Sequence, residues 1–228
     1  MTKLFSIYAG NIETWLPELL LFSITTLKIA ALAFVLAVIV GMFLAMLRIS
    51  KINPLVALAV AIIEVCRGLP IVVLLYIVYF VPPQLMRGLD WSWYNAFVGA
   101  VLGLGIHGGA ILAEVFRAGI EALHKGQREA ALSLGMTPAK SMRYILMPQA
   151  MRIVLPPVAN YGVGLLKETS LCSLIGVNEL MNDAKSIAFA DYEPMAIFLL
   201  TAMIYFAMSY PLSLALRHLE WRLNISQR

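Results

Sequence analysis

Charged side chains inside long apolar stretches are the residues of this sequence best suited to do chemistry. Glu64 and Arg67 interrupt one such stretch, and Lys167, Glu168 and Thr169 interrupt another. A charge at membrane depth is costly, so it is usually paired or faces a polar path. A carboxylate and a cation that face one cavity can bind the amino and carboxylate groups of a zwitterionic solute. These five residues are therefore the candidate solute-binding residues.

Each of these charges also has a purely structural explanation. Glu64 and Arg67 are three residues apart, so they share one face of a helix and can neutralise each other. Lys167 and Glu168 are adjacent and point in different directions, so at least one of them needs a partner on another helix. Charge pairs that only fix helix packing therefore stay open as an alternative to solute binding.

A third long apolar stretch is rich in glycine and carries one histidine. Small residues let helices approach closely, so the glycines predict a packing face. His107 lies among them and is predicted to be a hydrogen-bonded interior residue rather than a proton relay. Glu114 and Arg117 follow near the end of the stretch, and their spacing predicts an ion pair. The glycines are Gly99, Gly103, Gly105, Gly108 and Gly109.

The sequence offers no constellation for covalent or metal chemistry. It has no glycine-rich phosphate-binding loop that ends in Lys-Ser or Lys-Thr, no cluster with metal-ligand spacing, and no nucleophile beside an obvious base. Cys66 and Cys172 both fall in apolar runs and are predicted to be small buried hydrophobes. We therefore expect no catalytic residues, no metal and no cofactor in this chain, so any ATP must be bound by a partner.

The composition predicts a membrane protein. Of the 228 residues, 61% are hydrophobic and 13% are charged, whereas soluble domains have about 25% charged residues. The expected fold is all-α and polytopic, a single transmembrane domain of about five helices. Because a span needs about 20 apolar residues, the predicted spans are approximately 19–47, 55–80, 92–122, 151–170 and 194–217.

The distribution of basic residues predicts the orientation. Ten Lys and Arg residues fall on one side of the predicted spans, in the connections near 48–51 and 125–152 and in the tail from 217, against three on the other side. By the positive-inside rule the amino terminus is outside and the carboxyl terminus is cytoplasmic. The long polar connection at 125–148 is then cytoplasmic.

That connection, the coupling element 125–148, carries its own helix signals. Gln127 to Leu134 is predicted to be a short helix that ends with Gly135 in the left-handed conformation. Thr137 and Pro138 then predict the N-cap and first turn of a second helix that runs to about Met147.

Several segments in this order resemble a known family. Glu129-Ala130-Ala131 followed by Gly135 resembles the EAA motif of bacterial ABC-importer permeases. Around it the chain resembles the polar amino acid permeases of that group. The other matching segments are 64–70, 114–120, 126–131, 146–150 and 166–171.

The chain departs from the family pattern at three places. Met147 stands where Leu is usual, and Glu168 stands where Asp is common. Residues 106–109, Ile-His-Gly-Gly, replace a more usual stretch of small polar residues and Tyr. The last departure leaves the identity of the solute least defined.

The resemblance implies a permease subunit of an ATP-driven importer in the bacterial inner membrane. It implies a second permease, identical or a sister chain, two cytoplasmic ATPase subunits that bind ATP with Mg, and an extracytoplasmic solute-binding protein that delivers a polar amino acid. Membrane lipid surrounds the chain, and no nucleic acid is expected. The implied ATPase-coupling residues are Arg128, Glu129, Ala130, Ala131 and Gly135.

Two other classes of protein fit the sequence less well. A secondary transporter driven by an ion gradient would often show an internal repeat, which is missing here, and the odd span count also disfavours it. A membrane-embedded enzyme would need a nucleophile or metal constellation. The sequence does not decide which amino acid is carried, or whether the permease pair is a homodimer or a heterodimer.

Overall fold

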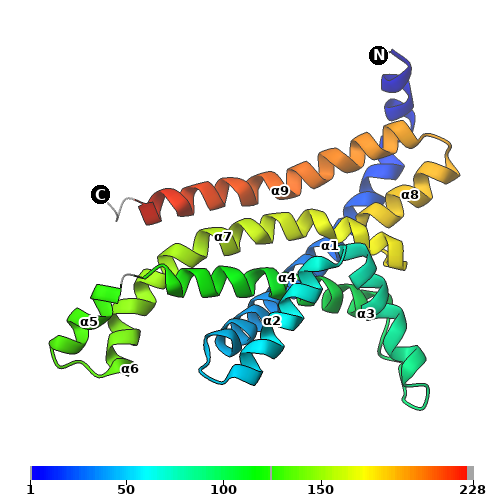
Figure 1. Cartoon of the computed structure of the whole chain (residues 1–228). Helices are drawn as coiled ribbons and strands as arrows, with labels where there is room; N and C mark the ends of the chain where they lie inside the picture. The colour runs from blue at the N-terminus through cyan, green and yellow to red at the C-terminus, as the bar shows by residue number, and fades with distance from the viewer. Residues whose placement is uncertain (1, 124, 225–228) are drawn as a thin grey trace.

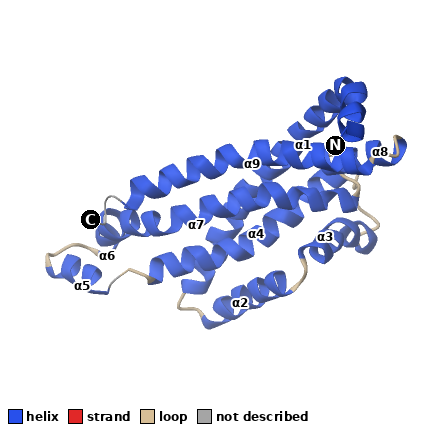
Figure 2. Cartoon of the chain, turned by 90° about the horizontal axis from the view of Figure 1, so that it is seen from above, coloured by secondary structure: helices blue, strands red, loops and turns tan. Residues whose placement is uncertain are grey.

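The computed structural model describes residues 2–123 and 125–224, and all the regular elements in these ranges are helices (Figures 1 and 2). This confirms the predicted all-α class. The elements are α1 (Thr2–Ile49), α2 (Asn53–Gly68), α3 (Ile71–Leu85), α4 (Ala96–Glu121), α5 (Lys125–Ser133), α6 (Pro138–Ser141), the π-helix η1 (Met142–Leu146), α7 (Met147–Glu168), the 3₁₀-helix η2 (Thr169–Ile175), α8 (Leu180–Ala190) and α9 (Pro194–Asn224).

Four long helices, α1, α4, α7 and α9, form the body of the molecule (Figure 1). α1 packs along α4, and α7 lies between α4 and α9. The glycines of α4 permit this contact, because a Cβ at Gly105 would lie 2.5 Å from the Leu36 side chain and one at Gly109 would lie 2.5 Å from Val40. The predicted glycine packing face is therefore confirmed.

Three helical segments are long and apolar enough to cross a membrane, namely Ile7–Ile49, Ala96–Glu121 and Pro194–Arg222. The pair α2 and α3 supplies a fourth if the two helices together make one span. α7 has 22 residues, carries Arg152, Lys167 and Glu168, and is not among these segments. The count of five spans therefore stays a prediction.

The predicted second span, 55–80, is two helices rather than one. α2 and α3 meet at an angle of 111° (Figure 2). The break falls at Leu69 and Pro70, where Leu69 has the extended backbone angles φ −86° and ψ 141°. Proline disfavours the helical conformation of the residue before it and has no N–H to donate, which explains the break.

The coupling element also differs from its prediction in one respect. Its second helix does not end near Met147 but continues through η1 into α7. Pro148 has no N–H for the carbonyl four residues earlier, and its ring would crowd that carbonyl in a regular α-helix. The wider π turn, in which the Met147 N–H donates to the Met142 carbonyl, relieves this conflict just before the proline. Pro148 therefore does not end the helix, and α6, η1 and α7 follow one another without a loop.

Between α7 and α9 the structure contains η2 and α8, which the sequence reasoning did not anticipate. Glu179 caps α8 and is fully buried. Its carboxylate accepts hydrogen bonds from the Met181 and Asn182 N–H groups, from Thr26 of α1 and from Tyr205 of α9. This carboxylate joins three helices, and every bond is to a protein partner.

The buried core lies in two main layers. One layer, at the end where α1 begins, packs Trp15 and Leu19 against α8 and α9. The other lies between α1, α3, α4 and α7 and contains Leu75, Leu104 and Cys172. Cys66 is buried as well, so both cysteines are small buried residues as predicted.

Candidate functional site

The turn between α5 and α6 has the predicted capping geometry. Gly135 has a φ of +78°, in the left-handed region. Its N–H donates to the Leu132 carbonyl at 2.9 Å, and the Met136 N–H donates to the Ala131 carbonyl at 3.1 Å, which together form a Schellman motif. Thr137 Oγ1 accepts from the Lys140 N–H at 3.3 Å. The turn therefore fixes the direction of α6 relative to α5.

The coupling residues differ in exposure. Glu129, Ala130 and Gly135 are exposed. Ala131 is only 4% exposed, so of the two alanines only Ala130 offers an exposed side chain to a partner. Arg128 belongs to α5, but its side chain lies outside the described residues.

Large apolar side chains on the same element were missed by the sequence reasoning. They are exposed to 83% at Leu134, 62% at Tyr144 and 47% at Met147. The Arg143 guanidinium lies over the Tyr144 ring, 5.7 Å from its centroid. An exposed apolar surface on a short helical hairpin is typical of a protein–protein contact. The sequence contains a signal for this surface, because Leu134, Tyr144 and Met147 are apolar residues in an otherwise polar connection.

Glu64 and Arg67 lie on the exposed side of α2, whereas Ile63 and Cys66 face the interior. No ion pair joins Glu64 to Arg67 within residues 2–123 and 125–224 as described. α2 packs on α1 and α4 only along one face, so these two charges point away from the body of this chain.

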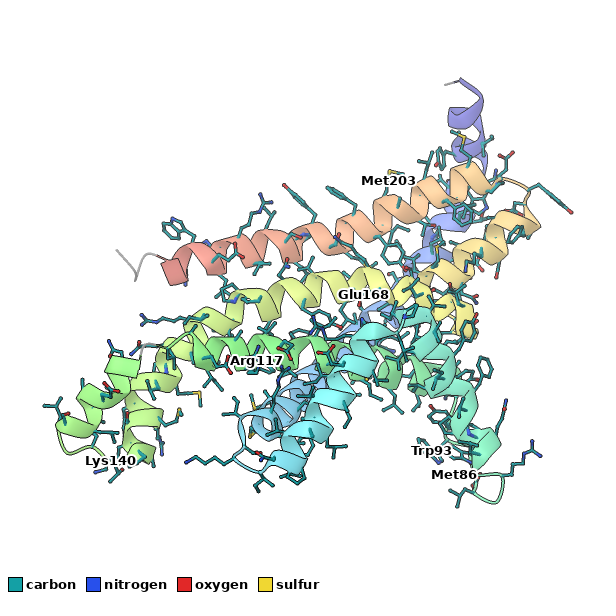
Figure 3. The ribbon with its side chains drawn as sticks, in the orientation of Figure 1. Met86, Trp93, Arg117, Lys140, Glu168 and Met203 are labelled. Atoms are coloured by element: carbon teal, nitrogen blue, oxygen red, sulfur yellow. The ribbon has the colours of Figure 1, made fainter. Side chains whose placement is uncertain are left out.

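Lys167, Glu168 and Thr169 point in three directions. Lys167 is exposed and lines a pocket of about 400 Å³ between α7 and α9, together with Ser170, Tyr205 and others. Thr169 is fully buried, and its hydroxyl donates to the Leu166 carbonyl at 2.7 Å. Glu168 is half-buried and lies at the end of α7 (Figure 3).

Among the described residues Glu168 forms no ion pair, and its buried Oε2 has no hydrogen-bond partner. The partner that the sequence predicts on another helix for Lys167 or Glu168 therefore stays a prediction. His107 Nδ1 of α4 lies 3.2 Å from the Cys66 carbonyl oxygen, beside the break between α2 and α3. His107 is therefore an interior, hydrogen-bonded histidine, as predicted.

A second charged cluster lies near the other end of α4, and we call Arg48, Glu114, Arg117 and Glu121 the inner ionic group. Arg117 pairs with Glu114 at 3.0 Å, which confirms the predicted pair, and also with Glu121. Arg48, at the end of α1, pairs with the other Glu114 oxygen. Both Glu114 oxygens are thus matched by cations, and the group ties α1 to α4.

These features define a class of protein. Helices long enough to span a membrane surround interior charges, a helix breaks inside a predicted span, and a helical hairpin projects from one end with an apolar surface. Unpaired backbone at membrane depth is tolerated where it is covered by protein or lines a polar path. The structure is therefore that of a helical membrane transport component.

Comparison with known proteins gives the family. A model described as "Binding-protein-dependent transport system inner membrane component" matches residues 37–225. The chain belongs to this family, which makes it a multi-pass inner-membrane transport component and not an enzyme. Nothing in the comparisons supports a secondary transporter.

Individual relatives agree with this assignment. The chain is 38% identical to the probable amino-acid ABC transporter permease protein YckA of Bacillus subtilis over 183 residues, which covers 80% of this chain and 79% of that protein. It is 37% identical to the glutamine transport system permease protein GlnP of Escherichia coli over 167 residues, 73% of this chain and 75% of that protein.

Solved structures agree as well. A structure titled as an amino acid ABC transporter with histidines matches with a TM-score of 0.84 and 36% identity, over 92% of this chain and 96% of that chain. The MetNI methionine ABC transporter, at a TM-score of 0.62 and 15% identity, covers 91% of this chain and 97% of that chain and shows the shared fold. Families of this kind work with an ATPase and a binding protein.

Proposed function

We propose that this protein is the permease subunit of an ATP-driven importer of a polar amino acid. The observation that carries the proposal is a buried carboxylate oxygen without a hydrogen-bond partner among the described residues, Glu168 Oε2, inside the predicted membrane region. The amino acid as solute is supported by the names of the relatives and of the matching transporter structure. Glu168 would pair with the amino group of the solute.

The proposal includes a second permease, either another copy of this chain or a sister. Glu64 and Arg67 lie on an exposed face of α2, where a charge in contact with lipid would be costly. A second permease that covers this face would turn it into a wall of the solute path. Arg67 and Lys167 are then the candidates for the solute carboxylate, with Thr169 in the packing behind them.

The coupling element 125–148 is proposed to seat on one of two cytoplasmic ATPase subunits, which bind ATP with Mg. The exposed apolar residues Leu134 and Tyr144 would form the centre of the contact, with Arg128, Glu129 and Ala130 at its rim and Ala131 and Gly135 shaping the hairpin. Closure of the ATPases would move the element as a rigid body and switch access to the cavity. The amino terminus is then extracytoplasmic, where a solute-binding protein delivers the amino acid.

The test of the function is uptake by the reconstituted transporter. Permease, ATPase and binding protein are assembled in proteoliposomes, and tritiated glutamine, arginine, glutamate and histidine are offered with ATP inside. We expect at least one of them to accumulate, with ATP and despite an uncoupler. Uptake that needs an ion gradient and ignores ATP would assign the chain to the secondary transporters instead.

The test of the coupling assignment is Glu129→Lys, with Glu13→Lys as a control at an exposed position far from the element. We expect Glu129→Lys to insert in the membrane but to lose transport and co-purification of the ATPase. If the ATPase still co-purifies and transport continues at the level of the control, the seating of the element on the ATPase is wrong.

A further inference from the structure

An apolar groove lies between α1, α7 and α9, on the side of the body that carries α9, opposite α2 and α3 (Figures 1 and 2). Its volume is about 490 Å³, and none of the described residues that line it is charged. The proposed second permease covers the exposed charges of α2, so it leaves this side of the body to other contacts. We call this feature the lateral groove.

The lateral groove has the composition of a surface that contacts hydrocarbon. Its walls include Ala159 and Gly162 of α7 and Ala215 and Leu219 of α9. Its width depends on small side chains, since a Cβ at Gly162 would lie only 3.1 Å from the Phe34 ring. Lipid tails are as apolar as such a wall, so an acyl chain can enter, but selectivity for one lipid must come from its headgroup.

Basic side chains lie beyond one end of the lateral groove. α7 and α9 run antiparallel (Figure 1), so the residues before Ala159 and those after Leu219 lie at the same end. Arg152 is seven residues before Ala159, and Arg222 is three residues after Leu219, so each continues the groove face of its helix. Both side chains are exposed. Arg222 forms no ion pair within residues 2–123 and 125–224.

Trp221 indicates the depth at which these cations lie. Its side chain is exposed at the end of α9, beside Arg222. Tryptophan is enriched where a membrane-spanning helix meets the headgroups. The lateral groove therefore runs from the level of the headgroups into the hydrocarbon, and by the proposed orientation this end lies at the cytoplasmic surface.

We propose that the lateral groove binds an acyl chain of an anionic phospholipid of the inner leaflet, whose phosphate pairs with Arg222 and Arg152. A guanidinium matches a phosphate with two parallel hydrogen bonds. Basic pockets between transmembrane helices on the cytoplasmic side are suited to anionic headgroups. A zwitterionic phospholipid has the same chains but brings its own cation beside the arginines, so it binds more weakly. The site goes beyond the proposed function and does not depend on which solute is carried.

Two variants separate the headgroup from the chain, and each has a matched control on α9. Arg222→Gln removes a cation at the groove end. Arg217→Gln is its control, because Arg217 is also exposed but lies two residues from both Ala215 and Leu219, on the other side of the helix. Ala215→Phe fills the groove, and Ala207→Phe makes the same change at an exposed position outside it.

The measurement is native mass spectrometry of the delipidated permease–ATPase complex, titrated with dioleoyl phosphatidylglycerol or dioleoyl phosphatidylcholine. These probes share their chains and differ in headgroup charge. We expect phosphatidylglycerol to bind at least about 5-fold more tightly, and Arg222→Gln to weaken it about 5-fold without changing phosphatidylcholine. Ala215→Phe should remove the tight binding of phosphatidylglycerol. Arg217→Gln and Ala207→Phe should bind both lipids as the unaltered complex does.

Three results would overturn the lipid site. Equal affinity for the two lipids, or equal losses in Arg222→Gln and Arg217→Gln, would rule out recognition of the headgroup. Tight binding of phosphatidylglycerol in Ala215→Phe at the level of Ala207→Phe would place the lipid elsewhere. Release of the second permease by Ala215→Phe would make this face a contact between permeases. None of these results involves uptake, so the proposed function stands or fails separately.

Discussion

Two groups of polar side chains touch α4, and they differ in how their charges are matched. In the inner ionic group both oxygens of Glu114 meet cations from α1 and α4. Between α4 and α7, Glu168 Oε2 and the Tyr161 hydroxyl form neither an ion pair nor a hydrogen bond among the described residues. A matched group holds helices together, whereas an unmatched one destabilises the fold and is available to a ligand. α4 is therefore tied to α1 by ion pairs near one end, whereas its middle faces polar atoms of α7 that have no such match.

Gly108→Ala should have the largest effect, because it removes the room for the Tyr161 hydroxyl. The new methyl group would lie 2.3 Å from that oxygen and 2.8 Å from the Ala37 Cβ. Overpacking of this kind costs about 1–3 kcal/mol, so the melting temperature of the purified complex should fall by several degrees.

Gly164→Ala is the control for that change. Gly164 is also inside a helix, but a Cβ there meets nothing within 4 Å, so a stability equal to or above that of the unaltered protein is expected. Equal melting temperatures for the two variants would show that the contact of Gly108 with the Tyr161 hydroxyl is not tight.

Glu114→Gln should come next. It leaves Arg48 and Arg117 facing each other without the carboxylate between them. Because the Glu114 side chain is 21% exposed, solvent screens part of the effect, and a loss of about 1–2 kcal/mol is expected. Thermal unfolding of the complex measures it.

Glu168→Gln sharpens the contrast, because it should leave stability unchanged or slightly raised while solute binding falls. Among the described residues the Glu168 carboxylate has no ion pair to lose, and its Oε2 accepts no hydrogen bond, whereas Glu114 pairs with two cations. A fall in melting temperature as large as that of Glu114→Gln would place Glu168 among the structural charges.

The smallest expected effect concerns Asp183 of α8, a second buried carboxylate, which lies outside the predicted spans. Burial, and secondly the charge of Glu18, raise the pKa of Asp183 to about 6, and its Oδ2 has no hydrogen-bond partner within residues 2–123 and 125–224. A raised folded-state pKa means that stability is highest below the unfolded value and is lost as the pH rises through about 6.

The unaltered protein should therefore gain about 2–4 °C in melting temperature between pH 7 and pH 5 relative to Asp183→Asn. The difference between the two proteins isolates this group from all others that titrate. An identical pH dependence of the two melting curves would contradict the raised pKa of Asp183.

Much of the architecture is predictable because it follows from local rules. The Gly135 turn and the Thr137 cap depend on a few adjacent residues, and both are found as expected. The glycine face of α4 follows from residue size alone. The break at Leu69 and Pro70 has a visible signal as well, but the apolar run on both sides favours a single span.

Other features depend on contacts between distant segments, which no local pattern reveals. In the sequence, Glu179 is an acidic residue in a connection between two predicted spans. In the structure, it is buried at the start of α8, and its carboxylate accepts hydrogen bonds from Thr26 of α1 and Tyr205 of α9. The partnership of His107 with Cys66 spans 41 positions. The sequence indicates that Lys167 and Glu168 diverge, but only the packing of α7 between α4 and α9 determines which one faces the interior.

The π turn at Met142–Leu146 has a mechanical consequence. Because it joins α6 to α7 without a loop, residues Pro138 to Glu168 form one continuous helical segment, which bends between Lys140 near one end and Glu168 at the other (Figure 3). Measured along its axis, at about 1.5 Å per residue, this segment is roughly 45 Å long. A displacement of α6 therefore has no loop to absorb it before it reaches Glu168.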